Sequence, residues 1–97
     1  MDEINVYTYP GQPTGQTFGD GIFEGISPTP GQFPQVVTQP TNGCAVAFNN
    51  GFNGWEISGP DLGLQQEQNV PDSFQFRVTD GTTHGQPITV PLVFVGA

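Results

Sequence analysis

The last quarter of the chain alternates apolar and polar residues with a period of two, in two runs that flank a turn. The alternating apolar positions are Phe74, Phe76, Val78, Ile88, Val90, Leu92 and Phe94. This period is typical of β-strands with one buried face, because successive side chains of a strand point to opposite sides. Asp80-Gly81 between the runs indicates a turn, since glycine adopts a positive φ without strain. The pattern predicts a β-hairpin over 73–95.

Two prolines constrain how the final run, 87–95, can pair. Pro87 and Pro91 both lack a backbone N–H. Because they are four residues apart, their missing donors lie on the same side of the strand. That side is expected to be an edge or a shielded flank, and the final strand is expected to pair mainly with residues 73–79.

Length and composition agree with one small domain. The chain has 97 residues, of which 34% are hydrophobic, and it contains 14 Gly and 10 Pro. These values approach the composition of disordered chains, but disordered chains are poor in aromatic residues, and this chain has eight Phe and one Trp. We therefore expect a small core built on phenylalanine, with long turns.

The charge balance excludes two classes of partner. Nine acidic residues face a single strong cation, Arg77, which gives a formal net charge of -8. Nucleic acids and anionic membranes attract Lys and Arg, so neither is expected to bind. Cys44 is the single cysteine, which precludes an internal disulfide, and its apolar neighbours predict a buried thiol. With no signal-peptide pattern, we expect synthesis in a host cytoplasm without export.

Prolines divide the chain near residue 43. Six of the ten prolines lie within residues 1–43, between apolar islands that are candidate strands at 4–9, 21–26 and 33–38. The stretch 10–19 is expected to be an extended connector. Residues 1–43 are either an arm that becomes ordered against a neighbour or the first strands of the same domain, and the sequence leaves both possibilities open.

Residues 44–97 are more regular and are expected to form the core of the domain. Turn residues separate candidate strands at 44–48, 54–58, 62–66, 73–79 and 87–95. No stretch has a helical period. The predicted fold is all-β: a small Ig-like or cadherin-like antiparallel β-sandwich with an extended Pro/Gly-rich N-terminal part.

Two resemblances add expectations about fold and function. The first lies in the last quarter of the chain, which resembles the penultimate strand and final loop of cadherin-like and chondroitin-sulfate-proteoglycan-type repeats through Asp72, Phe74, Phe76, Val78, Asp80 and Gly81. It implies an Ig-like or cadherin-like sandwich, although the calcium-linker motifs of cadherins are absent from the sequence. The second is one of layout: a small, acidic, Lys-free, Gly/Pro/Gln-rich chain is similar to decoration or cement proteins of tailed-phage capsids, in which an extended N-terminal arm crosses neighbouring subunits.

No residue pattern indicates catalysis, a metal site or a cofactor. His84 is the single histidine, and a zinc site needs three or four ligands at suitable spacing. A triad of Ser73, His84 and Asp80 lacks any supporting motif, so His84 is expected to be a solvated loop residue. Calcium at Asp72 and Asp80 is a weaker alternative without a calcium-loop sequence. The chain is therefore expected not to be an enzyme.

Binding to a macromolecule remains as the expected activity, in one of two forms. The leading hypothesis is a structural virion protein, a capsid decoration or cement protein present in many copies that contacts the major capsid protein through apolar anchors at Ile4, Val6, Tyr7, Tyr9, Phe18, Ile22 and Phe23. The alternative is an Ig-like adhesive or carbohydrate-binding surface module that uses Phe52 and Trp55. For Trp55, a place in the core competes with this role, because Trp55 and Ile57 share one face of a strand.

Overall fold

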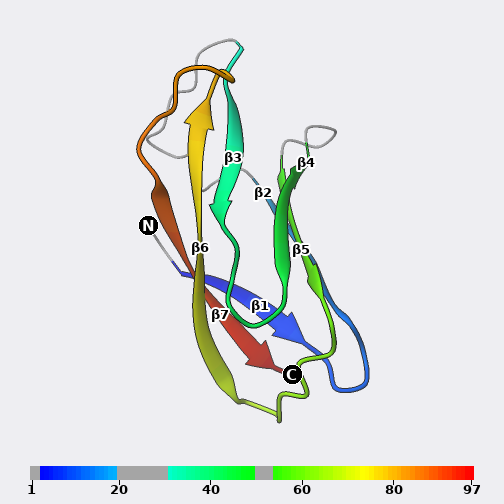
Figure 1. Cartoon of the computed structure of the whole chain (residues 1–97). Helices are drawn as coiled ribbons and strands as arrows, with labels where there is room; N and C mark the ends of the chain where they lie inside the picture. The colour runs from blue at the N-terminus through cyan, green and yellow to red at the C-terminus, as the bar shows by residue number, and fades with distance from the viewer. Residues whose placement is uncertain (1–2, 20–30, 50–53) are drawn as a thin grey trace.

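The computed structural model of the protein describes residues 3–19, 31–49 and 54–97, and this part of the chain forms seven strands and no helix (Figure 1). The strands are β1 (Ile4–Thr8), β2 (Thr14–Gly19), β3 (Phe33–Thr38), β4 (Ala45–Asn49), β5 (Gly54–Gly59), β6 (Asn69–Thr79) and β7 (Ile88–Gly96). The candidate strand at 21–26 and the turn at 50–53 lie outside the described residues.

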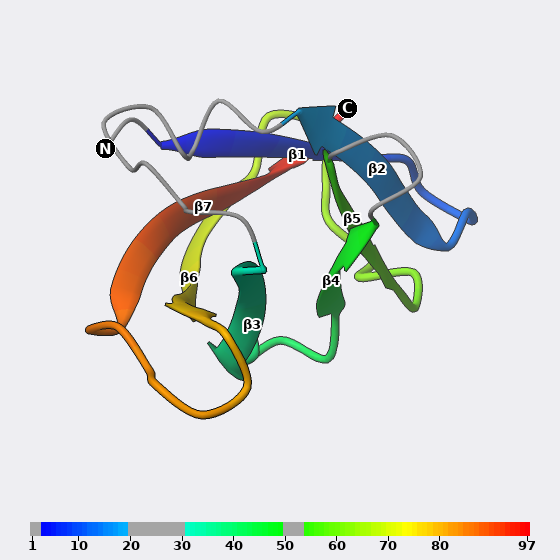
Figure 2. The same cartoon turned by 90° about the horizontal axis from the view of Figure 1, so that it is seen from above.

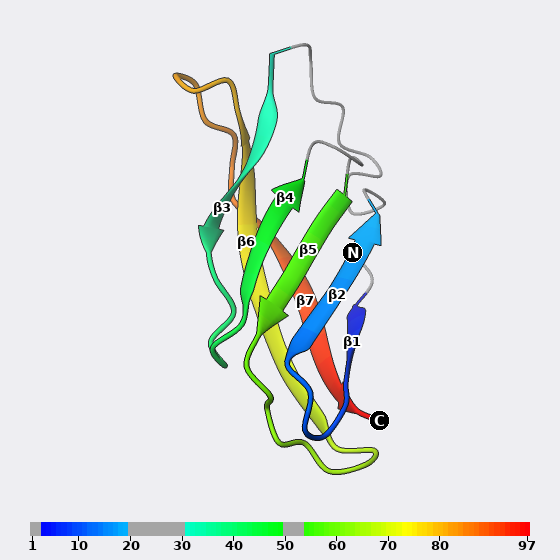
Figure 3. The ribbon, with the colours of Figure 1, turned by 90° about the vertical axis from the view of Figure 1, so that its right-hand side faces the viewer.

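The strands form two sheets that pack face to face as a sandwich (Figure 3). Sheet A has the order β1-β7-β6-β3, and sheet B has the order β2-β5-β4. The orders β3-β6-β7 and β2-β5-β4 match strands C-F-G and B-E-D of Ig-type sandwiches. The predicted all-β sandwich is therefore confirmed, and residues before 43 supply three of its described strands.

The predicted hairpin is present as β6 and β7, paired antiparallel from Asn69↔Val95 to Phe76↔Ile88. The opposite side of β7 is not an edge, however, because β1 pairs with it in parallel from Ile4↔Leu92 to Thr8↔Gly96. The expectation that this side is an edge or a shielded flank was wrong for the span 92–96. The physical reason is position: Pro87 and Pro91 both precede Leu92, so neither lies within the span that β1 covers.

The core lies between the sheets and is centred on Trp55, which is 0% exposed. Its ring centroid lies 5.4 Å from that of Phe74 and 5.2 Å from that of Phe76, the two inward aromatic residues of β6. Val6 of β1 is also fully buried. Strands from both halves of the chain therefore close one core, and burial of these large side chains is the main source of stability in a protein with one strong cation.

Two other local expectations were wrong. The stretch 14–19, expected within a connector, is strand β2, and it pairs with β5 from Thr14↔Gly59 to Gly19↔Gly54. Residues 62–66, expected as a short strand, are not a strand. They belong to a loop that packs on the end of β7, where Glu67 N donates to Gly96 O at 2.9 Å and Gly96 N donates to Gln68 O at 2.9 Å.

Glutamine side chains cover the backbone edges at both open sides of the sandwich, where β1 lies beside β2 and β3 beside β4 (Figure 2). Gln16 of β2 accepts from Tyr7 N at 3.0 Å and donates to Asn5 O at 2.9 Å. Gln39 accepts from Val46 N at 2.7 Å and donates to Val46 O at 3.2 Å. Each amide takes the place that a peptide group of an added strand would occupy, so it blocks pairing with other chains.

The outer edge of β3 is blocked by proline. Gly85 N donates to Val78 O at 2.8 Å on the β7 side of β6, so the backbone groups of Arg77 point toward β3. The backbone groups of its partner Gln35 therefore point toward β6, and those of Pro34 point away from the sheet. Because proline has no backbone N–H, this edge of β3 lacks a donor for an added strand at Pro34.

Candidate interaction surface

The outward side of sheet A, called face A below, collects the side chains that alternate with the buried ones. On β7 these are the half-buried or exposed residues Thr89, Pro91, Val93 and Val95. On β1 they are the exposed residues Asn5 and Tyr7. The strands set them side by side, because Tyr7 is in register with Val95, and Asn5 with Val93.

One end of face A is apolar. Tyr7 is 48% exposed and lies beside Val95, while Val93 is in register with the exposed Pro71 of β6. Tyr9, 58% exposed, is the first residue after β1, two positions beyond Tyr7. No described part of the chain covers these side chains.

The other end of face A, on β3 and β6, combines apolar and polar groups. Phe33 and Val37 are 43% and 46% exposed. Between them, Gln35 accepts a hydrogen bond from Arg77 Nε at 2.8 Å. Next to this pair, Gln75 accepts from Thr38 and donates to Thr89, which gives a strip of amide and hydroxyl groups across three strands.

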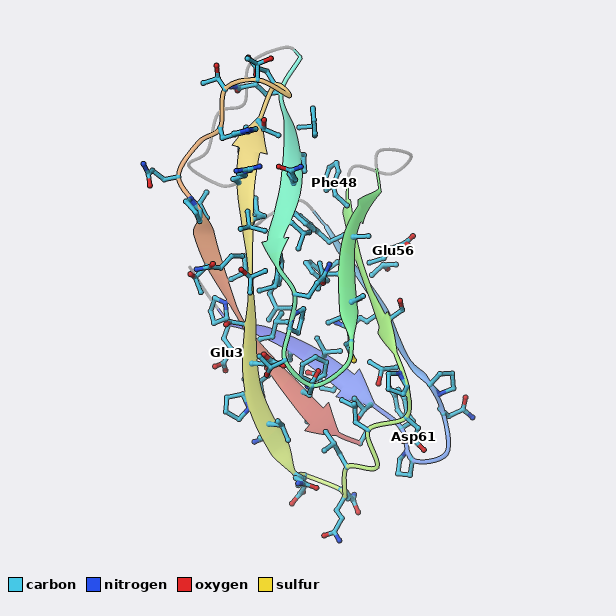
Figure 4. All side chains as sticks on the ribbon, viewed as in Figure 1. Glu3, Phe48, Glu56 and Asp61 are labelled. Carbon is cyan, nitrogen blue, oxygen red and sulfur yellow. The ribbon has the colours of Figure 1, made fainter. Side chains whose placement is uncertain are left out.

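Carboxylates are placed away from the centre of face A. Arg77 is the single charged residue among the outward-facing side chains of β3, β6 and β7. Glu56 and Asp61 lie on the side of β4 and β5, and Glu3 lies at the start of β1, at the rim (Figure 4). Face A thus contains tyrosine and arginine and few carboxylates, which is the composition that protein interfaces favour.

The expected anchors are spread between surface and core. Tyr7 and Tyr9 are exposed, Ile4 and Phe18 are half-buried, and Val6 is fully buried and cannot reach a partner. Ile22 and Phe23 lie outside the described residues. The alternation of β1 separates Tyr7 from Val6 and could have done so from the sequence. Sequence reasoning missed the outward residues Pro71, Val93, Val95, Phe33 and Val37.

Trp55 cannot contact a ligand in this fold, so the proposed ligand role of this residue was wrong. Its side chain is 0% exposed, with Phe18 stacked on it at 6.4 Å and Phe48 edge-on at 5.1 Å. The cause is the alternation of β5, which turns Trp55 and Ile57 inward and leaves Glu56 exposed. Phe52, its expected companion, lies outside the described residues.

The loop after β6 is organised by Asp80 and Thr79. Asp80 Oδ1 accepts from Thr83 N at 2.6 Å and from Thr82 N at 2.8 Å, and these hydrogen bonds lower the pKa of Asp80 below its usual value. The Thr79 hydroxyl lies 2.7 Å from His84 Nδ1 but is 1% exposed, so a substrate cannot reach it. Ser73 lies six residues back along β6, roughly 20 Å from Thr79, so the triad is not assembled.

The two candidate calcium ligands are also far apart. Asp72 and Asp80 are separated by the length of β6 between them, roughly 26 Å at 3.3 Å per residue. Asp72 instead holds the connection between β3 and β4, accepting from Thr41 N at 3.1 Å. Across the described ranges, no group of three or more His, Cys, Asp or Glu side chains is placed to hold a metal ion. Nor do those ranges contain a helix long and apolar enough to span a membrane.

Comparison with known proteins extends the description of the fold. No protein-family model matches the chain, and no curated protein sequence matches it. Among solved structures, the chain is similar to part of an endo-fucoidan hydrolase from glycoside hydrolase family 107, with a TM-score of 0.54 and 16% identity. The match covers 97% of this chain and 12% of the hydrolase. The expectation that the chain is not an enzyme is contradicted by this finding, because the same fold occurs within an enzyme; at this identity, the likeness concerns the fold alone.

Proposed function

We propose that this protein is an assembly module that binds a protein partner through face A and ties neighbouring subunits of a larger particle together. The observation that carries the proposal is the apolar end of face A, where Tyr7 adjoins Val95 and Val93 adjoins Pro71 and which no described segment covers. Soluble domains rarely leave contiguous apolar side chains exposed without a partner. Rigid strands hold this surface in shape, so docking would cost little conformational entropy.

The charge of the chain supports a particular kind of partner. A net charge of -8 favours approach to a basic surface and repels packaged nucleic acid. The contact region itself has few charges, so the attraction would act mainly at long range and the apolar contact at short range. A virion decoration or cement protein, present in many copies on a capsid, is the form of assembly module that we propose.

A cosedimentation assay that measures binding to the particle with which the protein copurifies tests this function. Tyr7→Glu places a charge on the apolar end of face A, and we expect it to weaken binding by tenfold or more. Ala47→Glu is the matched control, because Ala47 is exposed on the outer side of sheet B. Equal binding by both variants in a cosedimentation assay, with unchanged melting temperatures, would overturn the proposal.

A carbohydrate-binding surface module is the second candidate, and it is favoured by the exposed pair Tyr7 and Tyr9. Two exposed aromatic rings, one near the end of β1 and one just after it, offer flat surfaces on which a sugar ring can stack. The fold shared with part of an endo-fucoidan hydrolase agrees with a module used in glycan-active proteins. In affinity electrophoresis, retardation by a neutral β-glucan that Tyr9→Ala abolishes would favour this candidate over the first.

A further inference from the structure

We propose that Arg77 is the specificity-determining residue of face A and that it receives a single carboxylate from the protein partner. The proposal rests on the function proposed above and names the chemistry of the partner's contact. It begins from the sequence, in which Arg77 is the sole Lys or Arg beside nine acidic residues. Within the described ranges, no carboxylate lies within ion-pair distance of Arg77, although the chain is rich in acids. An arginine of this kind on a sheet face is a group prepared for an external anion.

The guanidinium is oriented for such a contact. Gln35, directly opposite on β3, accepts from Arg77 Nε at 2.8 Å. This hydrogen bond occupies the side of the guanidinium and leaves its outer edge, with two parallel Nη–H groups, for a carboxylate. Arginine forms two-point hydrogen bonds with carboxylates in this geometry. The half-buried position of Arg77 on β6 reduces the solvent screening that weakens exposed ion pairs.

The surroundings favour one carboxylate over a polyanion. The neighbouring polar groups are neutral: Gln75 accepts from Thr38 at 3.2 Å and donates to Thr89 at 3.0 Å. Phe33 and Val37 add exposed apolar area beside Arg77. A polyanion would bring many charges toward a chain of net charge -8 and gain one pairing. A protein surface with one Asp or Glu, or a C-terminal carboxylate, set among apolar groups would complement this end of face A.

Substitution of Arg77 gives the first test, using the same particle-binding assay. Removing one member of a hydrogen-bonded interface charge pair typically costs 2–5 kcal/mol, so Arg77→Gln should bind about 30-fold more weakly or worse. Arg77→Lys should also bind at least tenfold more weakly, because lysine lacks the planar fork. Ser58→Ala, at an exposed position of β5 in sheet B, is the control and should bind like the wild type. Arg77→Gln binding within threefold of wild type would overturn the inference.

Chemical labelling gives a second test that does not depend on a variant folding. Because the chain has one arginine and no lysine, phenylglyoxal should modify a single side chain, Arg77, which mass spectrometry can follow. We expect the partner to slow this modification at least tenfold, and equal rates with and without the partner would overturn the inference. If Arg77 proves irrelevant while Tyr7→Glu still abolishes binding, the proposed function stands without this contact. Normal binding by Tyr7→Glu would refute the proposed function itself.

The pH dependence distinguishes a carboxylate from a phosphate or sulfate on the partner. A carboxylate loses its charge near pH 4, whereas a phosphate monoester or a sulfate remains an anion there. The affinity ratio of wild type to Arg77→Gln should therefore fall as pH drops from 5 to 3, by about half at the pKa of the free carboxylate and about tenfold one pH unit below it. A ratio that stays constant over this range would overturn the carboxylate assignment.

Discussion

Replacing Gln39 by alanine removes both hydrogen bonds that cover the outer edge of β4 at Val46. The bonds measure 2.7 Å and 3.2 Å, and both are partly buried. A typical intramolecular hydrogen bond contributes about 1 kcal/mol net, so the pair contributes about 2 kcal/mol to the free energy of unfolding. In a domain of this size, each kcal/mol corresponds to roughly 4–8 °C in melting temperature, so Gln39→Ala should melt about 8–16 °C below wild type.

Fluorescence of Trp55 during urea unfolding provides the measurement, because this single tryptophan moves from full burial to water. Gln66→Ala, at an exposed loop position, is the control and should stay within about 0.5 kcal/mol of wild type. Gln39→Ala should also self-associate in size-exclusion chromatography, since the N–H and C=O of Val46 become available to another strand.

The isosteric change Gln39→Glu separates the two hydrogen bonds. It keeps an acceptor for Val46 N but sets a carboxylate oxygen against Val46 O. The carboxylate faces Val46 O in the folded state, which favours its protonated form. The instability of Gln39→Glu relative to wild type should therefore be large at pH 7 and should shrink as pH falls toward about 4.3, the ordinary pKa of glutamate, because the protonated carboxyl can donate to Val46 O. A loss under 0.5 kcal/mol in Gln39→Ala, or no pH dependence in Gln39→Glu, would refute the role given to this side chain.

Three further predictions concern stability and reactivity. Gly96→Ala should destabilise the protein by about 3 kcal/mol in urea unfolding, because an added Cβ would overlap the carbonyl oxygen of Gln65; a loss under 1 kcal/mol would contradict this packing. Asp80 has a lowered pKa, so its charge stabilises the fold above the unfolded pKa near 3.9, and this contribution disappears as pH falls through the lower folded value. Asp80→Asn should therefore be less stable than wild type at pH 6 and equal to it in strong acid, and equal stability at both pH values would refute the assignment. Burial raises the pKa of the Cys44 thiol, so Ellman's reagent should react with it only after urea unfolding, and rapid labelling of the native protein would count against a closed core.

The sequence was most informative where alternation was strong. The inward residues of β6 and β7, including Phe74 and Phe94, follow directly from the period of two. Strand β2 was missed because Phe18 is its one large apolar residue. Its conformation depends on pairing with β5, which is tertiary context and not local propensity.

The candidate surface could be foreseen only in part. Tyr7 and Tyr9 were named from the sequence, and counting by twos along β1 would have separated them from Val6. Val93 and Val95 share the parity of Thr89 and so follow from the same count, but the sequence did not single them out as surface residues because β7 is apolar on both faces there. The role of Arg77 required the register that sets it opposite Gln35, which no local pattern reveals.

The parallel pairing of β1 with β7 has a consequence for how the chain acquires its fold. Ile4 is in register with Leu92, so the first strand has no strand with which to form a backbone ladder until residues 92–96 have been made. Contacts of such long sequence separation slow folding, and all-β domains of this kind typically take milliseconds to seconds. At about 5–20 residues per second, a ribosome would need roughly 5–20 s to make the segment between these residues. Throughout that interval the nascent β1 would expose Val6 to water and depend on chaperones or dilution to avoid other chains.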